Sequence, residues 1–90
     1  MNLEVTGYKK ISEGVLHSYI EKAYENYLSG GKSLPHAAVA LGKSTQTIRY
    51  CIGKKTNLVS DEVLSKFFEL VQIDGFIVIK NGVRFFYIKN

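Results

Sequence analysis

Few side chains in this 90-residue chain could perform catalysis. There is one cysteine, Cys51, and there are two histidines, His17 and His36, none at the spacing of a catalytic pair or a metal site. The chain also has no clustered carboxylates and no glycine loop that would cradle a phosphate. We therefore expect a protein that is not an enzyme and has no metal or cofactor. Both histidines are expected at the surface without partners, and the Cys51 thiol in the core.

Basic side chains are the other candidates for function, and they are unevenly placed. The formal net charge is +4. Residues 26–60 contain no acid and five basic residues, which are Lys32, Lys43, Arg49, Lys54 and Lys55. Residues 76–90 also contain no acid, and their basic residues are Lys80, Arg84 and Lys89. A polyanion would be attracted to these two stretches. A solvated basic surface is the alternative.

The longer acid-free stretch contains a pattern for two short helices, within residues 33–52. Ser33 and Pro35 are typical of a helix start, and Gly42 is typical of the left-handed residue that ends a helix. Ser44 then favours a second start. In that second helix Ile48 and Cys51 share one face, which leaves hydrogen-bonding side chains on the other face.

This pattern resembles the helix-turn-helix of bacterial and phage DNA-binding proteins. Ala38, Gly42, Ile48 and Cys51 stand where that motif needs a small residue, a turn glycine and two apolar residues. Residues 47–50 are also similar to the recognition helix of the MerR regulators. The resemblance implies that the second helix reads base edges and that its neighbours contact phosphates. The implied DNA-binding residues are Lys43, Ser44, Thr45, Gln46, Thr47, Arg49, Tyr50, Lys54 and Lys55.

Two longer helices are predicted on either side of the motif. Ser12 favours the start of a helix that runs to about residue 28 and carries an apolar stripe. Ser60 favours the start of another, over residues 61–72, whose core face contains Val63, Leu64, Phe67, Phe68 and Val71. Residues 53–57 form a polar loop, either a phosphate clamp or a solvated connector. Residues 3–6 are either an edge strand or a disordered start.

Residues 76–88 predict a β-hairpin around Asn81-Gly82, the pair typical of a type I′ turn. The implied register pairs Lys80 with Val83 and Phe76 with Tyr87. Because both faces of this hairpin are mainly apolar, something must cover the second face. We expect one face on helix 61–72 and the other in a homodimer interface. The dimer residues are Ile77, Ile79, Phe86 and Ile88. A monomer with the hairpin between helices is the alternative.

The sequence therefore predicts one α+β domain: a mainly helical helix-turn-helix unit of about four helices with a C-terminal β-hairpin. The order of elements is similar to small phage repressors of the Cro type, with an added helix before the hairpin, and a winged-helix arrangement is an alternative. No signal peptide or membrane span is evident, so a cytoplasmic, nucleoid-associated protein is expected.

The expected function is sequence-specific binding of double-stranded DNA by a transcription regulator, a repressor from a bacterium, phage or plasmid. The alternative is a protein-interaction module that uses the same fold to bind another protein, which would need exposed large apolar residues on the recognition face. RNA binding is a third possibility, and it would need Phe85, Phe86 and Tyr87 exposed on a sheet. No small-molecule ligand is evident.

Overall fold

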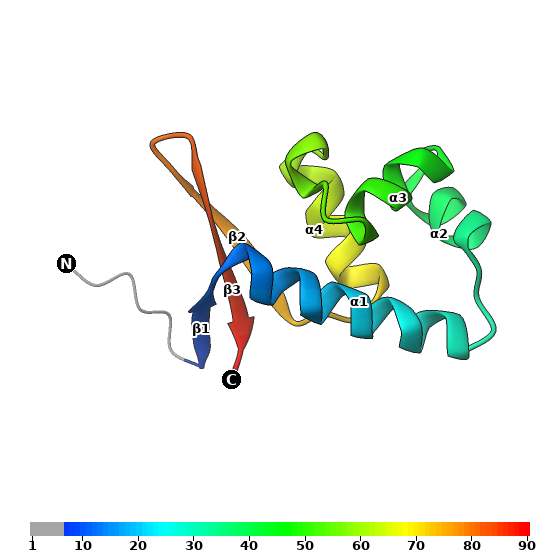
Figure 1. Ribbon diagram of the computed structural model, residues 1–90, viewed down its shortest axis with the longest axis horizontal. Helices are drawn as coiled ribbons and strands as arrows, with labels where there is room; N and C mark the ends of the chain where they lie inside the picture. Colours follow the sequence, from blue (N-terminus) through cyan, green and yellow to red (C-terminus); the bar gives the residue numbers. More distant parts are fainter. Residues whose placement is uncertain (1–6) are drawn as a thin grey trace.

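The computed structural model describes residues 7–90 as helices beside a small antiparallel sheet (Figure 1). The elements are β1 (Tyr8–Ile11), α1 (Glu13–Ser29), α2 (Leu34–Leu41), α3 (Thr45–Ile52), a 3₁₀ turn η1 (Thr56–Leu58), α4 (Asp61–Leu70), β2 (Gly75–Lys80) and β3 (Val83–Lys89). In Figure 1 the sheet lies at one end, and α1 runs from it along one side of the other helices. The predicted α+β class, with four helices and a C-terminal hairpin, is confirmed. The possible strand at residues 3–6 lies outside the described residues.

Serine side chains fix the starts of the two longest helices. The Ser12 Oγ accepts a hydrogen bond from the backbone N–H of Val15, and the Ser60 Oγ accepts one from Val63, each over 3.2 Å. These bonds satisfy helix N–H groups that have no partner within the helix. Helix α4 ends earlier than predicted, and Gln72 nearby takes a left-handed conformation with φ of 62°.

The hairpin forms in the predicted register, from Lys80 opposite Val83 to Phe76 opposite Tyr87. Asn81 and Gly82 have φ angles of 53° and 75°, as a type I′ turn requires. At the other end of the hairpin, Gly75 lies against β3. A Cβ there would stand 2.5 Å from the carbonyl oxygen of Tyr87, so only glycine allows this close approach.

A third strand that the sequence did not predict completes the sheet. Strand β1 pairs with β3, which places β3 in the middle in the order β1-β3-β2. Ile11 lies opposite Phe86, and Lys10 opposite Tyr87. Four residues with two adjacent lysines carry little strand signal by themselves. The strand forms because β3 offers it an edge.

The core lies between α1, α3, α4 and the inner face of the sheet. Its largest fully buried side chains include Phe67 and Phe68 of α4 and Leu16 and Ile20 of α1. Phe86 and Ile88 belong to the same cluster, and Ile77 packs against it. None of the helices within residues 7–90 combines the length and apolarity that a bilayer crossing needs.

The hairpin face that was predicted to form the dimer interface therefore packs against the helices. Phe86 and Ile88 are each 5% exposed, so the prediction that they lie at the surface is wrong. Ile79, near the hairpin turn, remains 53% exposed. The reason is the distribution of charge. The outward face carries the exposed Lys10 and Lys80. On the inner face Arg84 has protein partners, and Lys9, opposite Ile88 in the edge strand β1, is exposed.

Candidate nucleic-acid interface

The turn between α2 and α3 has the geometry that the helix-turn-helix pattern requires. Gly42 adopts the left-handed conformation, with φ of 63° and ψ of 33°. The Lys43 N–H donates to the carbonyl oxygen of Ala38 over 3.0 Å, and the Gly42 N–H donates to Val39 over 3.1 Å. These two bonds form a Schellman motif, which a residue with a Cβ would strain. The turn therefore fixes the direction in which α3 leaves α2.

The inner sides of α2 and α3 are buried as predicted. Ala38 is 6% exposed, and Ile48 and Cys51 are fully buried. Burial raises the pKa of the Cys51 thiol to about 11, so it is neutral and unreactive near neutral pH. The small side chain of Ala38 allows α2 and α3 to approach closely. Helix α3 therefore packs on the protein with the face that contains Ile48 and Cys51.

The outer side of α3 presents polar side chains. Gln46 and Arg49 are exposed, whereas Thr45, Thr47 and Tyr50 are half-buried. Tyr50 also packs against the core cluster, which makes it partly a structural residue. The structure thus places the predicted side chains on one continuous surface around the first turns of α3.

The start of α3 adds two further predicted residues to this surface. Lys43 and Ser44 are both exposed, and the Ser44 hydroxyl makes no capping hydrogen bond to the helix. The hydroxyl can therefore serve a ligand at the helix start.

Beyond α3, the predicted basic loop is held by a backbone hydrogen bond to the helix. Lys54 and Lys55 are exposed, and Lys54 has a φ of 64°. The Lys55 N–H donates to the carbonyl oxygen of Tyr50 over 3.1 Å, which folds the loop back toward α3. The 3₁₀ turn η1 follows, and its first residue, Thr56, is fully buried. Both lysines are therefore held beside the end of the candidate recognition helix.

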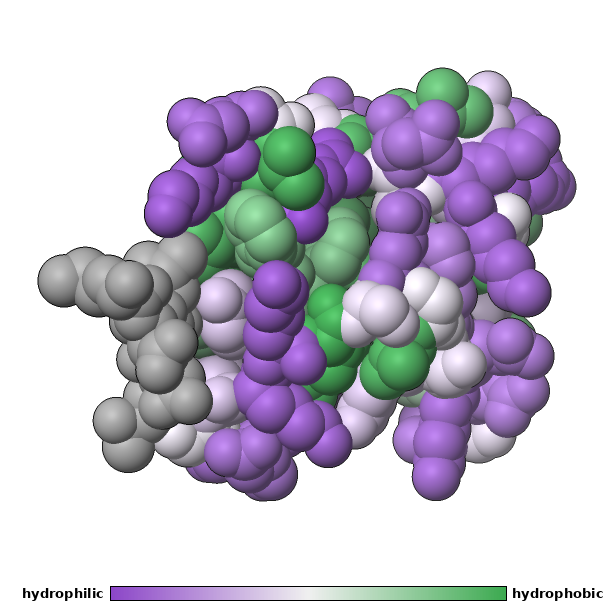
Figure 2. Space-filling view, turned by 60° about the vertical axis from the view of Figure 1, so that its left-hand side comes forward, coloured by the Kyte–Doolittle hydropathy of each residue, from purple (hydrophilic) through white to green (hydrophobic). Residues whose placement is uncertain are grey.

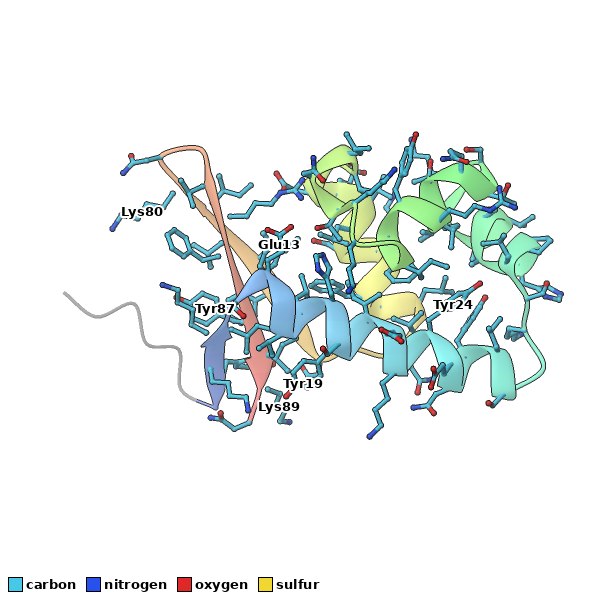
Figure 3. All side chains as sticks on the ribbon, in the orientation of Figure 1. Glu13, Tyr19, Tyr24, Lys80, Tyr87 and Lys89 are labelled. Atoms are coloured by element: carbon cyan, nitrogen blue, oxygen red, sulfur yellow. The ribbon has the colours of Figure 1, made fainter. Side chains whose placement is uncertain are left out.

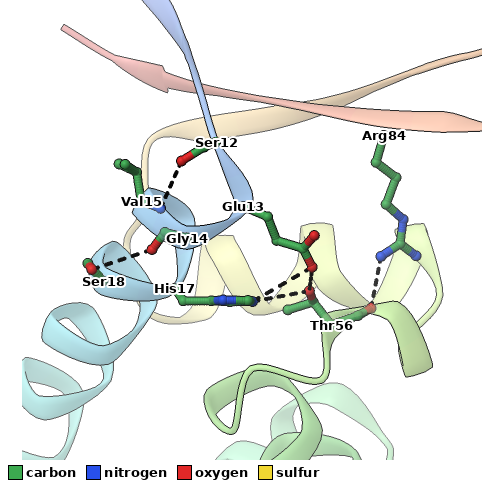
Figure 4. A network of polar contacts seen from close by, with 8 residues as sticks. All are labelled: Ser12, Glu13, Gly14, Val15, His17, Ser18, Thr56 and Arg84. Carbon is green, nitrogen blue, oxygen red and sulfur yellow. Dashed lines mark hydrogen bonds and ion pairs between the residues drawn. The ribbon is translucent and has the colours of Figure 1, made fainter.

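Arg84 ties the hairpin to this same segment (Figure 4). Its Nη1 and Nη2 donate to the carbonyl oxygens of Thr56 and Val59 over 2.8 and 2.5 Å. Its Nε forms an ion pair with the Oδ1 of Asp61, an atom that is otherwise buried without a partner. The sequence pattern predicted Arg84 only as a cation that would attract a polyanion. Its place among Ile77, Phe86 and Ile88 in the predicted register could have shown that it needs partners.

A second group of polar contacts joins α1 to η1. The Thr56 Oγ1 donates to the Glu13 Oε1 over 3.1 Å. The His17 Nε2 lies 3.5 Å from the same hydroxyl and 3.9 Å from the carboxylate. The His17 side chain is 14% exposed, so the prediction that it is a surface residue without a partner is wrong. His36 is exposed, but its Nδ1 lies 2.8 Å from the Ser33 Oγ, so it too has a partner.

The two acids at the start of α4 are paired with cations. Asp61 and Glu62 begin α4, where a helix dipole favours negative charge. Asp61 is paired with Arg84, and the Glu62 carboxylate lies 3.4 Å from the Lys66 Nζ. Because both acids have a cation beside them, they oppose the approach of a polyanion less than free carboxylates would.

The hairpin turn reaches the same side of the molecule as α3 and η1 in Figure 1. Lys80 lies next to the turn, is exposed and points away from the helices in Figure 3. Arg84, on the neighbouring strand, holds this part of the hairpin against η1. The turn thus projects on the same side of the molecule as α3, with η1 and α4 between them.

The outward face of the sheet is aromatic and basic. Phe76 stacks on Tyr87 with ring centroids 5.1 Å apart, and Tyr8 meets Phe76 edge-on at 5.0 Å. The Lys10 Nζ lies 4.6 Å from the centre of the Phe85 ring. Figure 2, which is turned toward the sheet, shows apolar side chains gathered between hydrophilic ones. Phe86 faces the core, Tyr87 is 5% exposed and Phe85 is half-buried, so none of the three aromatics expected to stack on RNA is fully accessible.

Because the comparisons with known proteins found no match, the function has to be inferred from these geometric features. No protein-family model matches the chain, and no curated protein or solved structure is significantly similar to it.

Proposed function

We propose that this protein is a sequence-specific DNA-binding transcription regulator that inserts α3 into the major groove. The observation that carries the proposal is the contrast between the two sides of α3. Ile48 and Cys51 are fully buried, whereas Gln46 and Arg49 project into solvent from a stretch without acids. Arginine pairs well with guanine and glutamine with adenine at the major-groove edge.

Contacts to the DNA backbone would come from both ends of α3. At its start, Lys43, the free Ser44 hydroxyl and Thr45 are available to a phosphate, and helix N–H groups there favour an anion. At its end, Lys54 and Lys55 are held close by the hydrogen bond from Lys55 to Tyr50. Contacts of this kind position the helix in the groove without reading the sequence.

The hairpin would act as a wing beside α3. Arg84 fixes it against η1, and Lys80 offers a cation near the turn. A wing held in this way would reach the DNA backbone next to the major-groove contacts. Repression is the simplest regulatory action for the domain, because covering a promoter requires only DNA binding.

A homodimer belongs to the proposal, with the interface moved to the outward face of the sheet. Phe76, Val78 and Phe85 are half-buried there, and Val83 is 53% exposed. A second copy would cover this face and would place two α3 helices on neighbouring half-sites. A near-palindromic operator is therefore expected.

Protein binding is the second candidate function. The observation that favours it is the exposure of two aliphatic side chains near the motif, Val39 at 82% and Leu58 at 57%. Neither lies on α3, whose outer face has no exposed large apolar residue. The dependence of binding on salt separates the two functions, because DNA binding releases counterions and an apolar protein interface does not.

The test begins with selection of bound sequences from a random duplex library. A single enriched motif that binds with a steep salt dependence would support the proposal. The variant Lys43→Ala, Lys54→Asn, Lys55→Ala should weaken specific and non-specific binding alike. Its log–log salt slope should fall by about 0.9 for each phosphate that the variant no longer neutralises. Asparagine is chosen at residue 54 because it tolerates the positive φ.

The matched control removes three lysines far from α3, namely Lys9, Lys22 and Lys89, by replacement with alanine. It has the same net charge and should keep the wild-type salt slope. Equal losses of affinity in both variants would reduce the effect to net charge, and the absence of any enriched motif would contradict sequence-specific binding.

A further inference from the structure

A groove lies on the side of α2 that faces away from the core. Its walls come from the second half of α1, the connector to α2, the outer side of α2 and the end of α4. The volume is about 790 Å³, within the range of pockets that bind small molecules. Ala23, Tyr27 and Leu70 contribute apolar surface, and Val39 stands exposed at 82% along one wall.

The charge of the groove is one-sided. Lys32 and His36 are its cationic or potentially cationic lining residues, and no carboxylate lines it. His36 is exposed, and the contact between its Nδ1 and the Ser33 Oγ restrains the imidazole. The other polar lining side chains are neutral. The groove therefore complements a negative group attached to an apolar body.

Its dimensions favour a small molecule over a helix of another protein. Helix α2 has eight residues, so it forms a wall about 12 Å long. A helix bound along that length would contribute about two turns, which are unstable alone. The connector between α1 and α2 also lines the groove. A compact ligand uses such a site better than an extended one.

We propose that this groove binds a small amphipathic anion, with its apolar part against Tyr27, Val39 and Leu70 and its negative group at Lys32. The outer face of α3 contributes no lining residue. The ligand and the proposed DNA surface are therefore separate, and the groove can be tested without DNA.

The experiment compares two probes that differ in charge, 2-naphthoate and 2-naphthylmethanol, titrated into the full chain and followed by backbone amide NMR. Both should shift amides of the groove, among them those of Tyr27 and Val39. The carboxylate should bind more tightly than the alcohol by roughly five-fold, as an exposed ion pair allows. Lys32→Ala should abolish that preference, whereas Lys22→Ala, also on the surface but outside the groove lining, should preserve it.

A second variant makes the result independent of the ion pair. Ala40 lines the groove and is exposed, so Ala40→Phe should fill the space without disturbing the core and should remove binding of both probes. Equal affinity for the two probes, shifts located outside the groove, or no shifts at millimolar concentration would each overturn the proposal. So would a dimer mass in sedimentation that Val39→Glu converts to a monomer, because a second copy would then occupy the groove.

Discussion

Arg84 of the central strand donates a hydrogen bond to the carbonyl oxygen of Thr56, over 2.8 Å, in the segment that follows α3. The same guanidinium reaches Val59 and Asp61, so one side chain joins the hairpin to η1 and to the start of α4. Arginine suits this place because its planar fork donates several bonds in fixed directions. This side chain therefore holds the hairpin against the segment that follows the candidate recognition helix.

Replacing Arg84 should show that its guanidinium holds the hairpin against η1 and the start of α4. We expect Arg84→Met to lower the free energy of unfolding by about 1.5–3 kcal/mol, because it leaves buried acceptors without a charged donor. Arg84→Lys should restore only part of this, since an ammonium group cannot serve all three partners. Urea unfolding measures both effects. Lys80→Ala, at an exposed residue of the neighbouring strand β2, is the control, and a loss of stability as large as that of Arg84→Met would contradict this assignment.

Base readout should depend on Gln46 and Arg49, the two exposed polar residues of α3. We expect Gln46→Ala and Arg49→Ala each to weaken binding to the selected operator by about 1–3 kcal/mol, with relaxed preference at one position. Their melting temperatures should match that of wild type, because both side chains project into solvent. Fluorescence anisotropy on operator and scrambled duplexes measures the difference. Wild-type affinity in both variants would remove α3 from the interface.

The proposed dimer forms through the outward face of the sheet. We expect Val78→Lys to convert a dimer into a folded monomer. Val78 belongs to the edge strand β2 and lies on this face opposite Phe85, so the lysine would place a charge in the proposed interface. Phe86→Lys should instead unfold the chain, since it places a charge in the core. Analytical ultracentrifugation with a parallel thermal melt separates these outcomes. A wild-type monomer at micromolar concentration would refute the dimer.

The hairpin shows how far the sequence alone could lead. Turn chemistry at Asn81 and Gly82 and the period of two determined the register, and every predicted pair is present. The prediction of which face packs on the helices was wrong, because Arg84 is accommodated on the inner face by Thr56, Val59 and Asp61, which are remote in sequence. The buried Thr56 and its contacts with Glu13 and His17 escaped prediction for the same reason. These partners come from separate elements that only the tertiary fold brings together.

The helix-turn-helix was predictable because its signals are local. Gly42 and the small Ala38 act within a few residues of each other, and the structure places both as expected. Whether the outer side of α3 binds DNA is a property of its surface. That part stays a prediction until binding is measured.

Two glycine-to-alanine replacements should have opposite effects on stability. Gly75→Ala should destabilise the fold by about 1–3 kcal/mol, because its Cβ would stand 2.5 Å from a backbone oxygen of β3. Gly14→Ala should stabilise it by up to about 1 kcal/mol, because that glycine is helical and open space surrounds its Cβ position. Thermal unfolding of the two variants compares them directly, and similar melting temperatures would contradict the packing of β2 on β3.

The buried thiol should make stability depend on alkaline pH. Cys51 has a pKa of about 11 in the folded chain, raised by burial from its ordinary 9.0. The unfolded thiol therefore ionises first, so its contribution to stability is complete below pH 9 and is lost as the pH rises to about 11. The expected loss of stability is about 1.4 kcal/mol per pKa unit. The measurement is the difference between wild type and Cys51→Ala in urea unfolding at several pH values, and a difference that does not change with pH would contradict it.

The central position of β3 decides the order in which the protein can be completed during synthesis. Tyr8 donates a hydrogen bond to Asp74, 66 residues further along the chain, and β1 pairs only with β3 among the described strands. A ribosome must therefore release residues 83–89 before β1 or β2 finds its neighbour, while the helices can form as they emerge. Until then two strands have open edges, and the core lacks Phe86 and Ile88. Nascent chains arrested before residue 83 should be the form of this protein that chaperones and proteases recognise.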